Sequence, residues 1–120
     1  MKEDVQKRLG IAKKDLNSAT HAVEFMDYSL TAFLCQQSVE KGLKALYIKK
    51  FNELKKTHDL FFLGRKVELP KKLLSICEEL NSFYFITRYP DVSDEECSKE
   101  DAVHAIENAR EVLSWIEKNI

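Results

Sequence analysis

Residues 33 to 46, FLCQQSVEKGLKAL, contain the pattern that decides the fold. Their apolar side chains recur at spacings of three and four, which predicts a helix over about residues 29–50. Further apolar residues are interleaved with the polar ones, so this helix is apolar around much of its circumference and should contact other elements on two sides. We therefore predict that it is the central helix of an all-α domain. Its apolar side consists of Ala32, Cys35, Val39, Gly42, Leu43 and Leu46.

The other side of the same helix carries five polar residues, Gln36, Gln37, Glu40, Lys41 and Lys44. Glu40 and Lys44 stand four residues apart, in the order that favours an intrahelical ion pair worth about 0.2–0.5 kcal/mol. Gly42 lies between them in the sequence, and a glycine inside a helix costs about 1 kcal/mol relative to alanine. This cost makes sense if the backbone of another helix crosses closely at that position.

The helix that precedes the central one is predicted over about residues 2–25, and a break near Asp27 separates the two. His21 falls on its polar side and is interpreted as a solvated surface histidine. The apolar stripe of this helix is Val5, Leu9, Ala12, Leu16, Ala19 and Val23.

Three further helices are predicted after the central one. We expect Thr57 to supply the N-cap of a short helix whose first turn contains Asp59. Pro70 should open a longer helix, and Ser98 with Asp101 should form the capping box of the last one. The two longer helices have apolar stripes at Leu73, Ile76, Cys77, Leu80 and Phe83 and at Ala102, Ala105, Ile106, Ala109, Val112, Leu113 and Ile116.

Length and composition agree with one helical domain over residues 1–120, because the chain has only 3 Gly and 2 Pro and 32% charged residues. The predicted architecture is an up-and-down bundle of four longer helices plus one short helix. The 19 Lys and Arg nearly balance the 20 Asp and Glu, and the net charge is -1. The chain as a whole therefore has no field that attracts nucleic acid or membrane, and any nucleic-acid contact has to be local.

The cysteines and histidines show no pattern of a metal site. Cys35, Cys77 and Cys97 are widely spaced and form no CxxC pair. Cys35 and Cys77 lie in apolar runs and are interpreted as buried thiols, whereas Cys97 is expected to be exposed. No glycine-rich phosphate loop is present either, so we predict no metal and no cofactor.

The chain starts without an apolar signal core, and no apolar run approaches the roughly 20 residues that cross a bilayer. We therefore expect a cytoplasmic protein without membrane contact.

A second polar cluster surrounds the stretch TRYPDV, which begins at Thr87. A metal-free ribonuclease needs a general base, a general acid and a cation beside the phosphate. Arg88, His58 and Asp59 are the residues that a compact bundle could gather for this. The structural alternative stays open, because His58 follows an expected cap and Arg88 could pair with Asp91 or bond the carbonyls at a helix end.

Three motifs in this order, FLCQQSVEKGLKAL, THDL at 57–60 and RYPD at 88–91, followed by an alanine-rich last helix, resemble the HEPN domain family. The resemblance covers essentially the whole chain. It implies an up-and-down bundle of four or five helices that commonly forms a two-fold dimer. Many family members are encoded beside a small nucleotidyltransferase and form toxin and antitoxin pairs. The positions of the family pattern are Gln37, Glu40, Lys41, Lys44, His58, Asp59, Arg88 and Asp91.

Active members of this family are metal-independent ribonucleases with an Arg-x(4–6)-His motif, usually assembled in the dimer cleft. In this sequence the first histidine after Arg88 is His104, so the motif is absent. We therefore expect a dimeric module that binds a nucleotide or a partner protein and is associated with a nucleotidyltransferase in a toxin–antitoxin type of system. Residues 36–44 and 87–91 should then share one wall of a pair of protomers.

Two alternatives remain open at this point. The first is a metal-independent ribonuclease toxin, acting on RNA, in which His58 or His104 joins Arg88 in a dimer cleft. The second is a purely structural helical scaffold. Trp115 lies on the polar side of the last helix, where either a loop half-covers it or another subunit buries it.

Overall fold

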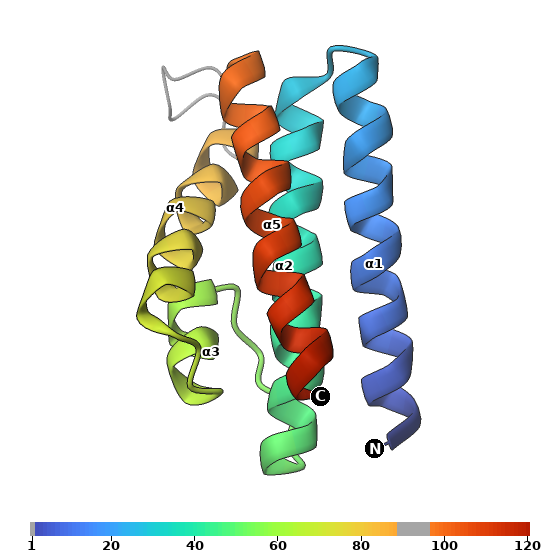
Figure 1. The fold of residues 1–120 in the computed structure, drawn as a ribbon, viewed down its shortest axis with the longest axis vertical. Coiled ribbons are helices and arrows are strands. Elements are labelled where there is room, and N and C mark those ends of the chain that lie inside the picture. The colour runs from blue at the N-terminus through green and yellow to red at the C-terminus, as the bar shows by residue number, and fades with distance from the viewer. Residues whose placement is uncertain (1, 89–96) are drawn as a thin grey trace.

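The computed structural model consists of helices and their connections, and it describes the backbone of residues 2–88 and 97–120 and the side chains of residues 4–83 and 97–120. The helices are α1 (Lys2–Glu24), α2 (Tyr28–Phe51), α3 (Leu60–Lys66), α4 (Lys71–Arg88) and α5 (Lys99–Asn119). Figure 1 shows α1, α2 and α5 side by side along the long axis, with α4 and the short α3 covering the remaining side. The predicted all-α bundle of four longer helices and one short helix is confirmed.

Helix α2 is the centre of this bundle, because it packs against each of the other four described helices. The six residues predicted for its apolar side are all buried. Its polar side is also largely covered, since Gln36 and Glu40 are buried together with Ser38, whose hydroxyl donates to the carbonyl of Ala12 on α1 at 2.6 Å. The prediction of a central helix with contacts on more than one side is therefore confirmed.

Gly42 is a point of close approach between α2 and α5. A Cβ atom at this position would lie 2.9 Å from Cδ1 of Leu113 and 3.2 Å from Cδ1 of Ile116, both on α5. Helix α5 does cross α2 closely at this glycine, but the groups that a Cβ would meet are side-chain methyls and not the helix backbone that the sequence predicts.

The helix ends are fixed by local hydrogen bonds. The Asp27 side chain accepts from the backbone N–H of Leu30 at the start of α2. Ser98 and Asp101 form the predicted capping box, in which each side chain accepts from the other residue's backbone N–H at 3.0 and 3.2 Å. None of the described helices has both the length and the apolar composition needed to cross a membrane.

The predicted start of the short helix is wrong by two residues. Asp59, not Thr57, is the N-cap of α3, and its carboxylate accepts from the backbone N–H groups of Phe61 and Phe62 at 3.0 and 3.2 Å. Thr57 acts one step earlier, because its hydroxyl accepts from the backbone N–H of Asp59 at 3.1 Å. A carboxylate is the stronger acceptor for the exposed N–H groups of a first turn, so the cap falls on the aspartate.

The expectation of an exposed Cys97 is also wrong. Its exposed fraction is 9%, and it packs with Ala32 and Ala102 in a small apolar cluster beside the main core. Burial raises the pKa of the Cys97 thiol to about 11, and it raises the pKa values of Cys35 and Cys77 to about 12. All three thiols are therefore protonated at neutral pH.

Candidate functional site

Glu40 lies at the middle of α2, and only 6% of its side chain is exposed. Its carboxylate contacts two basic side chains, Lys44 and His58. Its Oε2 accepts from Nζ of Lys44 at 3.2 Å, so the predicted ion pair is confirmed. Its Oε1 lies 2.9 Å from Nδ1 of His58, which comes from the connection between α2 and α3. The Glu40–Lys44 ion pair is largely buried and is not a surface pair. It therefore carries a desolvation cost that the sequence pattern did not indicate.

Two glutamines extend this contact along α2. Gln36 is fully buried, and its Nε2 lies 3.4 Å from Oε1 of Glu40, at the long end of a hydrogen bond. Gln37 donates from Nε2 to Oε1 of Gln36 at 2.7 Å. We name Gln36, Gln37, Glu40, Lys44 and His58 the Glu40 network. Within the described side chains, every fully buried nitrogen or oxygen atom has a hydrogen-bond partner.

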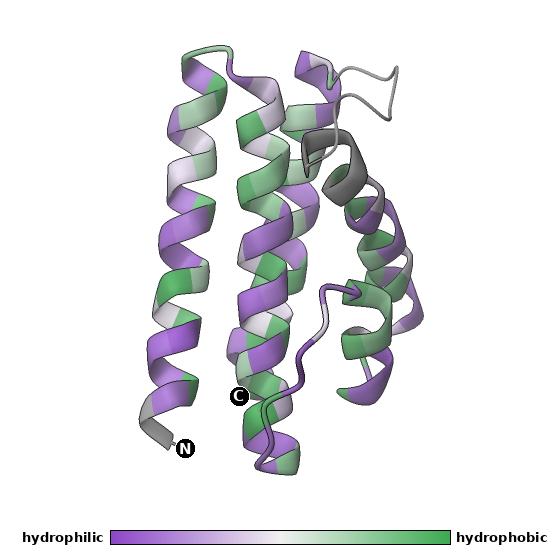
Figure 2. Cartoon of the chain, turned by 180° about the vertical axis from the view of Figure 1, so that it is seen from behind, coloured by the Kyte–Doolittle hydropathy of each residue, from purple (hydrophilic) through white to green (hydrophobic). Residues whose placement is uncertain are grey.

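The position of His58 is set by the residue that follows it. Asp59 caps α3, and its Oδ1 also accepts from Nδ2 of Asn81 on α4 at 2.9 Å. Oδ1 of Asn81 in turn accepts from the backbone N–H of Leu60 at 2.9 Å. We call these hydrogen bonds of Asn81 with Asp59 and Leu60 the clamp, and they fix the end of the connection between α2 and α3. Figure 2 shows this hydrophilic connection running along α2 into the largely hydrophobic α3.

The imidazole of His58 is therefore held with one ring nitrogen on a buried carboxylate, while 54% of its side chain is exposed. When Glu40 is ionised, its oxygens only accept, so Nδ1 of His58 carries the shared proton. A carboxylate that accepts from one ring nitrogen fixes the orientation and the tautomer of the ring. The network thus presents an oriented imidazole at the surface between α2 and α3.

The structure brings four of the predicted site residues together and places two others elsewhere. Gln37, Glu40, Lys44 and His58 belong to the Glu40 network, as described above. Lys41 instead donates to Oδ2 of Asp15 on α1 at 2.5 Å. Asp59 joins the network only indirectly, by holding the backbone next to His58.

Two predicted residues fall outside the described side chains. Arg88 is the last residue of α4, and only its backbone is described; Asp91 lies outside the described residues altogether. The predicted wall shared by residues 36–44 and 87–91 therefore stays a prediction.

His104, the other histidine considered, lies on α5 and takes part in a different contact. Its Nε2 is 3.6 Å from Oε2 of Glu79 on α4, and the same oxygen accepts from Nδ2 of Asn108 at 3.0 Å. Trp115, lower on α5, is half-buried and packs against the main core. No group of three or more possible metal ligands occurs among the described residues.

Sequence reasoning missed two residues that build the site. Gln36 was assigned to the polar side of the central helix, but it is fully buried. Asn81 is not among the predicted site residues, although it stands four residues after Cys77 and eight after Leu73, in line with the apolar stripe of α4. A single amide in register with a buried stripe is the signal that could have identified it.

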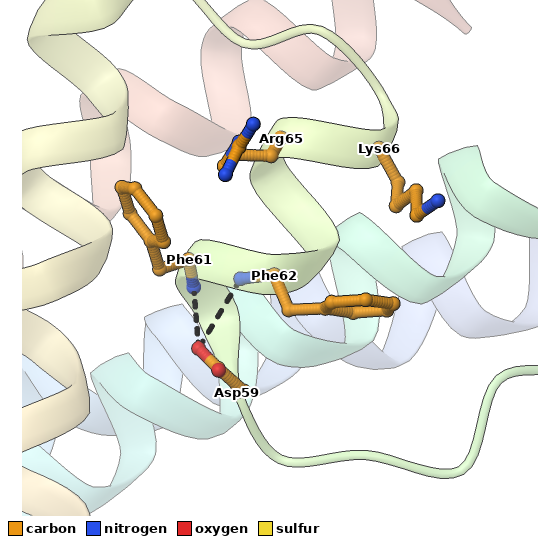
Figure 3. A pocket seen from close by; sticks show the side chains of 5 residues that line it. All are labelled: Asp59, Phe61, Phe62, Arg65 and Lys66. Atoms are coloured by element: carbon orange, nitrogen blue, oxygen red, sulfur yellow. Dashed lines mark hydrogen bonds between the residues drawn. The ribbon is translucent and has the colours of Figure 1, made fainter.

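A shallow pocket of about 460 Å³ adjoins the site on the outer side of α3. It is lined by Asp59, Phe61, Phe62, Arg65 and Lys66, and Figure 3 shows the Asp59 carboxylate below the first turn of α3 with the four other side chains around the helix. Only Asp59 connects this pocket to the clamp that positions His58.

One family model and two solved structures are similar to this chain. The model of the HEPN domain matches residues 5–119 of this chain. The crystal structure of TT1696 from Thermus thermophilus superimposes with a TM-score of 0.89 over 97% of this chain and 98% of that chain, at 24% sequence identity, which shows likeness of fold. The crystal structure of ST0689, an archaeal HEPN homologue, gives a TM-score of 0.81 over 96% of both chains at 29% identity. Comparison with curated proteins gave no match.

Proposed function

Because this chain belongs to the HEPN domain family, we propose that it is a dimeric module that binds a nucleotide or a partner protein and is associated with a nucleotidyltransferase. The proposed biological setting is a toxin–antitoxin type of system, since many family members are encoded beside such an enzyme. The proposed contact surface includes the exposed part of the Glu40 network.

The observation that supports this proposal is the burial of the Glu40 carboxylate beneath an exposed imidazole. Moving a carboxylate out of water costs several kcal/mol, and an apolar side chain of similar size would fill the same space without that cost. The network is therefore best explained by what it presents, which is a fixed imidazole at the surface between α2 and α3, with the largely buried Lys44 ammonium beside the same carboxylate. Such groups suit the phosphate of a nucleotide or the carboxylates of a partner.

Binding is favoured over cleavage because the sequence lacks the Arg-x(4–6)-His motif. The Glu40 network is therefore proposed to hold a ligand and not to cleave it.

The first test is co-purification with the nucleotidyltransferase encoded beside the gene, together with light scattering to measure the mass of each complex. We expect a dimer and a stable complex at micromolar concentrations. Glu40→Gln should weaken the complex, or nucleotide binding measured by calorimetry, whereas Glu117→Gln should not, because Glu117 forms only an exposed ion pair with Lys13. A monomer that binds neither nucleotides nor the nucleotidyltransferase would contradict the proposal.

A second candidate function, metal-independent RNA cleavage, is favoured by one observation. The 2.9 Å contact between Glu40 and Nδ1 of His58 is the kind of carboxylate contact that orients a histidine for general acid–base work. This candidate predicts RNA cleavage that EDTA does not inhibit and that His58→Gln abolishes while His104→Gln leaves it in place. Intact RNA after incubation with the purified dimer, with and without EDTA, would exclude it.

A further inference from the structure

Positive charge is concentrated between the end of α2 and the start of α4. Residues 49–72 contain eight Lys and Arg against three Asp and Glu, a local balance of +5 in a chain whose net charge is -1. The remaining residues therefore carry -6. We name the eight cations and the rings between them the basic surface, and its cations are Lys49, Lys50, Lys55, Lys56, Arg65, Lys66, Lys71 and Lys72.

Helix α3 supplies two pairs of an aromatic ring and a cation on this surface. Phe61 and Arg65 stand four residues apart, as do Phe62 and Lys66, and such pairs share one side of a helix. Figure 3 shows Phe61 and Arg65 on one side of α3 and Phe62 and Lys66 on the other, around the pocket of about 460 Å³. The ammonium groups of Lys55 and Lys66 lie 5.5 and 5.7 Å from the centre of the Phe62 ring.

Two more pockets continue this surface around the turn that joins α3 to α4. The first, of about 420 Å³, is lined by Leu46, Lys49, Lys50, Val67, Glu68, Trp115 and Asn119. The second, of about 370 Å³, is lined by Pro70, Lys72, Leu73, Glu111, Ser114, Trp115 and Lys118. Trp115 lines both pockets, so one further ring lies among lysines at the C-terminal part of α5.

The cations nearest to α3 are available for an anion. Lys55, Arg65 and Lys66 form no ion pair with any residue in the described part of the chain. Lys50 and Lys72 do pair, with Glu68 at 3.0 Å and with Glu111 at 2.8 Å. Ion pairs between exposed side chains are worth about 0–1 kcal/mol, so a phosphate can replace them at little cost.

We propose that the basic surface binds single-stranded nucleic acid, with its cations on the phosphates and the rings of Phe61, Phe62 and Trp115 beside the bases. Rings interleaved with cations along a groove are typical of proteins that bind single strands without reading sequence. A duplex fits less well, because its bases are stacked inside and cannot reach shallow pockets. This site does not depend on the proposed function, since none of these side chains belongs to the Glu40 network, and it requires no cleavage.

The test is fluorescence anisotropy with labelled 20-nucleotide oligo-uridylate, oligo-thymidylate and duplex DNA, titrated with the full chain. We expect the two single strands to bind more tightly than the duplex, with dissociation constants of about 1–100 µM. The ratio of the dissociation constants for oligo-uridylate and oligo-thymidylate shows whether RNA or DNA is preferred. Binding should weaken as salt is raised, with a slope of about -0.7 in log K against log salt for each phosphate contacted.

Matched variants separate the basic surface from charge elsewhere. Arg65→Gln with Lys66→Gln should weaken binding about tenfold or more and reduce the salt slope by about 1.4. Lys7→Gln with Lys14→Gln removes the same charge from the exposed side of α1 and should have a smaller effect. Phe61→Leu should weaken binding about fivefold or more with the slope unchanged, because it removes stacking and not charge.

Three results would overturn the proposal. One is the absence of single-strand binding up to about 100 µM protein at low salt. Another is an equal loss of binding affinity in the control variant of α1, Lys7→Gln with Lys14→Gln. The third is equal displacement by poly-glutamate, which would indicate a surface for acidic peptides or for polyanions in general. Circular dichroism of each variant shows whether it is folded, and a result from an unfolded variant is replaced by one from the single Lys66→Gln variant.

Discussion

At the scale of the residue, Glu40 is the side chain on which the site is built. It is nearly inaccessible to water, yet it contacts an ammonium, an imidazole and an amide. Each contact offsets part of the cost of its burial, and the cost returns when the contacts are removed. The stability of the bundle and the orientation of His58 therefore depend on the same carboxylate.

Replacing this carboxylate should lower stability. We expect Glu40→Gln to reduce the free energy of unfolding by about 1–3 kcal/mol, because Lys44 and His58 lose an ionised acceptor while the shape is kept. Urea denaturation followed by circular dichroism measures the change. Glu117→Gln, in an exposed pair, should stay within about 0.5 kcal/mol of the unaltered chain. Equal changes in the two variants would show that the burial of Glu40 has no energetic consequence.

The cysteines allow a second prediction at this scale. Burial raises the pKa of Cys35, Cys77 and Cys97, so the reactive thiolate is scarce in the folded chain near neutral pH. At pH 8 a thiol reagent should label the three cysteines slowly in the native protein and quickly in the protein unfolded by denaturant. The raised thiol pKa values also predict that the free energy of unfolding falls as the pH rises above about 9. Thiols of the unfolded chain ionise near pH 9.0, whereas those of the folded chain ionise only near pH 11 to 12, so high pH favours the unfolded chain.

Fast labelling of the native chain at Cys35 would contradict this prediction. Cys97 should react first of the three, since it retains 9% exposure and the other two are fully buried.

At the scale of the element, the start of α3 is held by its own cap and by a side chain of α4. Asp59 caps α3 and also accepts from Asn81 of α4, whereas Thr57 only supports Asp59. We expect Asp59→Ala to cost about 1–2 kcal/mol and Thr57→Ala clearly less. Thermal or urea unfolding of both variants measures the difference. The reverse order would restore Thr57 as the cap.

Glycines in two helices provide a matched pair of variants. A Cβ at Gly10 of α1 meets nothing within 4 Å, so Gly10→Ala should stabilise the chain by about 0.8–1 kcal/mol through helix propensity. At Gly42 the same gain is opposed by overlap with methyls of Leu113 and Ile116, and overpacking costs about 1–3 kcal/mol. We expect Gly42→Ala to be neutral or destabilising in urea denaturation. Equal gains at both glycines would show that the two helices separate easily.

The elements were predictable from sequence to the extent that they depend on local spacing. The stripes of α1, α2, α4 and α5 were read correctly, because residues three and four apart share a helix face whatever surrounds them. The burial of Cys97 was not, since it depends on Ala32, which is 65 residues away in the sequence. The contacts of Glu40 and Asn81 were not predictable for the same reason, because His58 and the backbone of Leu60 come from other segments of the chain.

At the scale of the whole molecule, α2 is in contact with every other described helix, so no part of the bundle has a core of its own. We therefore expect unfolding in one step. Circular dichroism reports all helices, and the fluorescence of Trp115 reports packing at α5, so the two urea transitions should coincide. A fluorescence transition at lower urea than the helical one would indicate that α5 separates first.

The clamp between Asp59 and Asn81 has a consequence for the order in which a newly made chain acquires its chemistry. A ribosome-bound chain that has emerged only as far as α3 already exposes both Glu40 and His58, but the Asn81 amide that holds the backbone next to His58 is still inside the exit tunnel. The clamp can form only after α4 has folded back on the growing polypeptide, so a nascent fragment lacks the finished surface around His58.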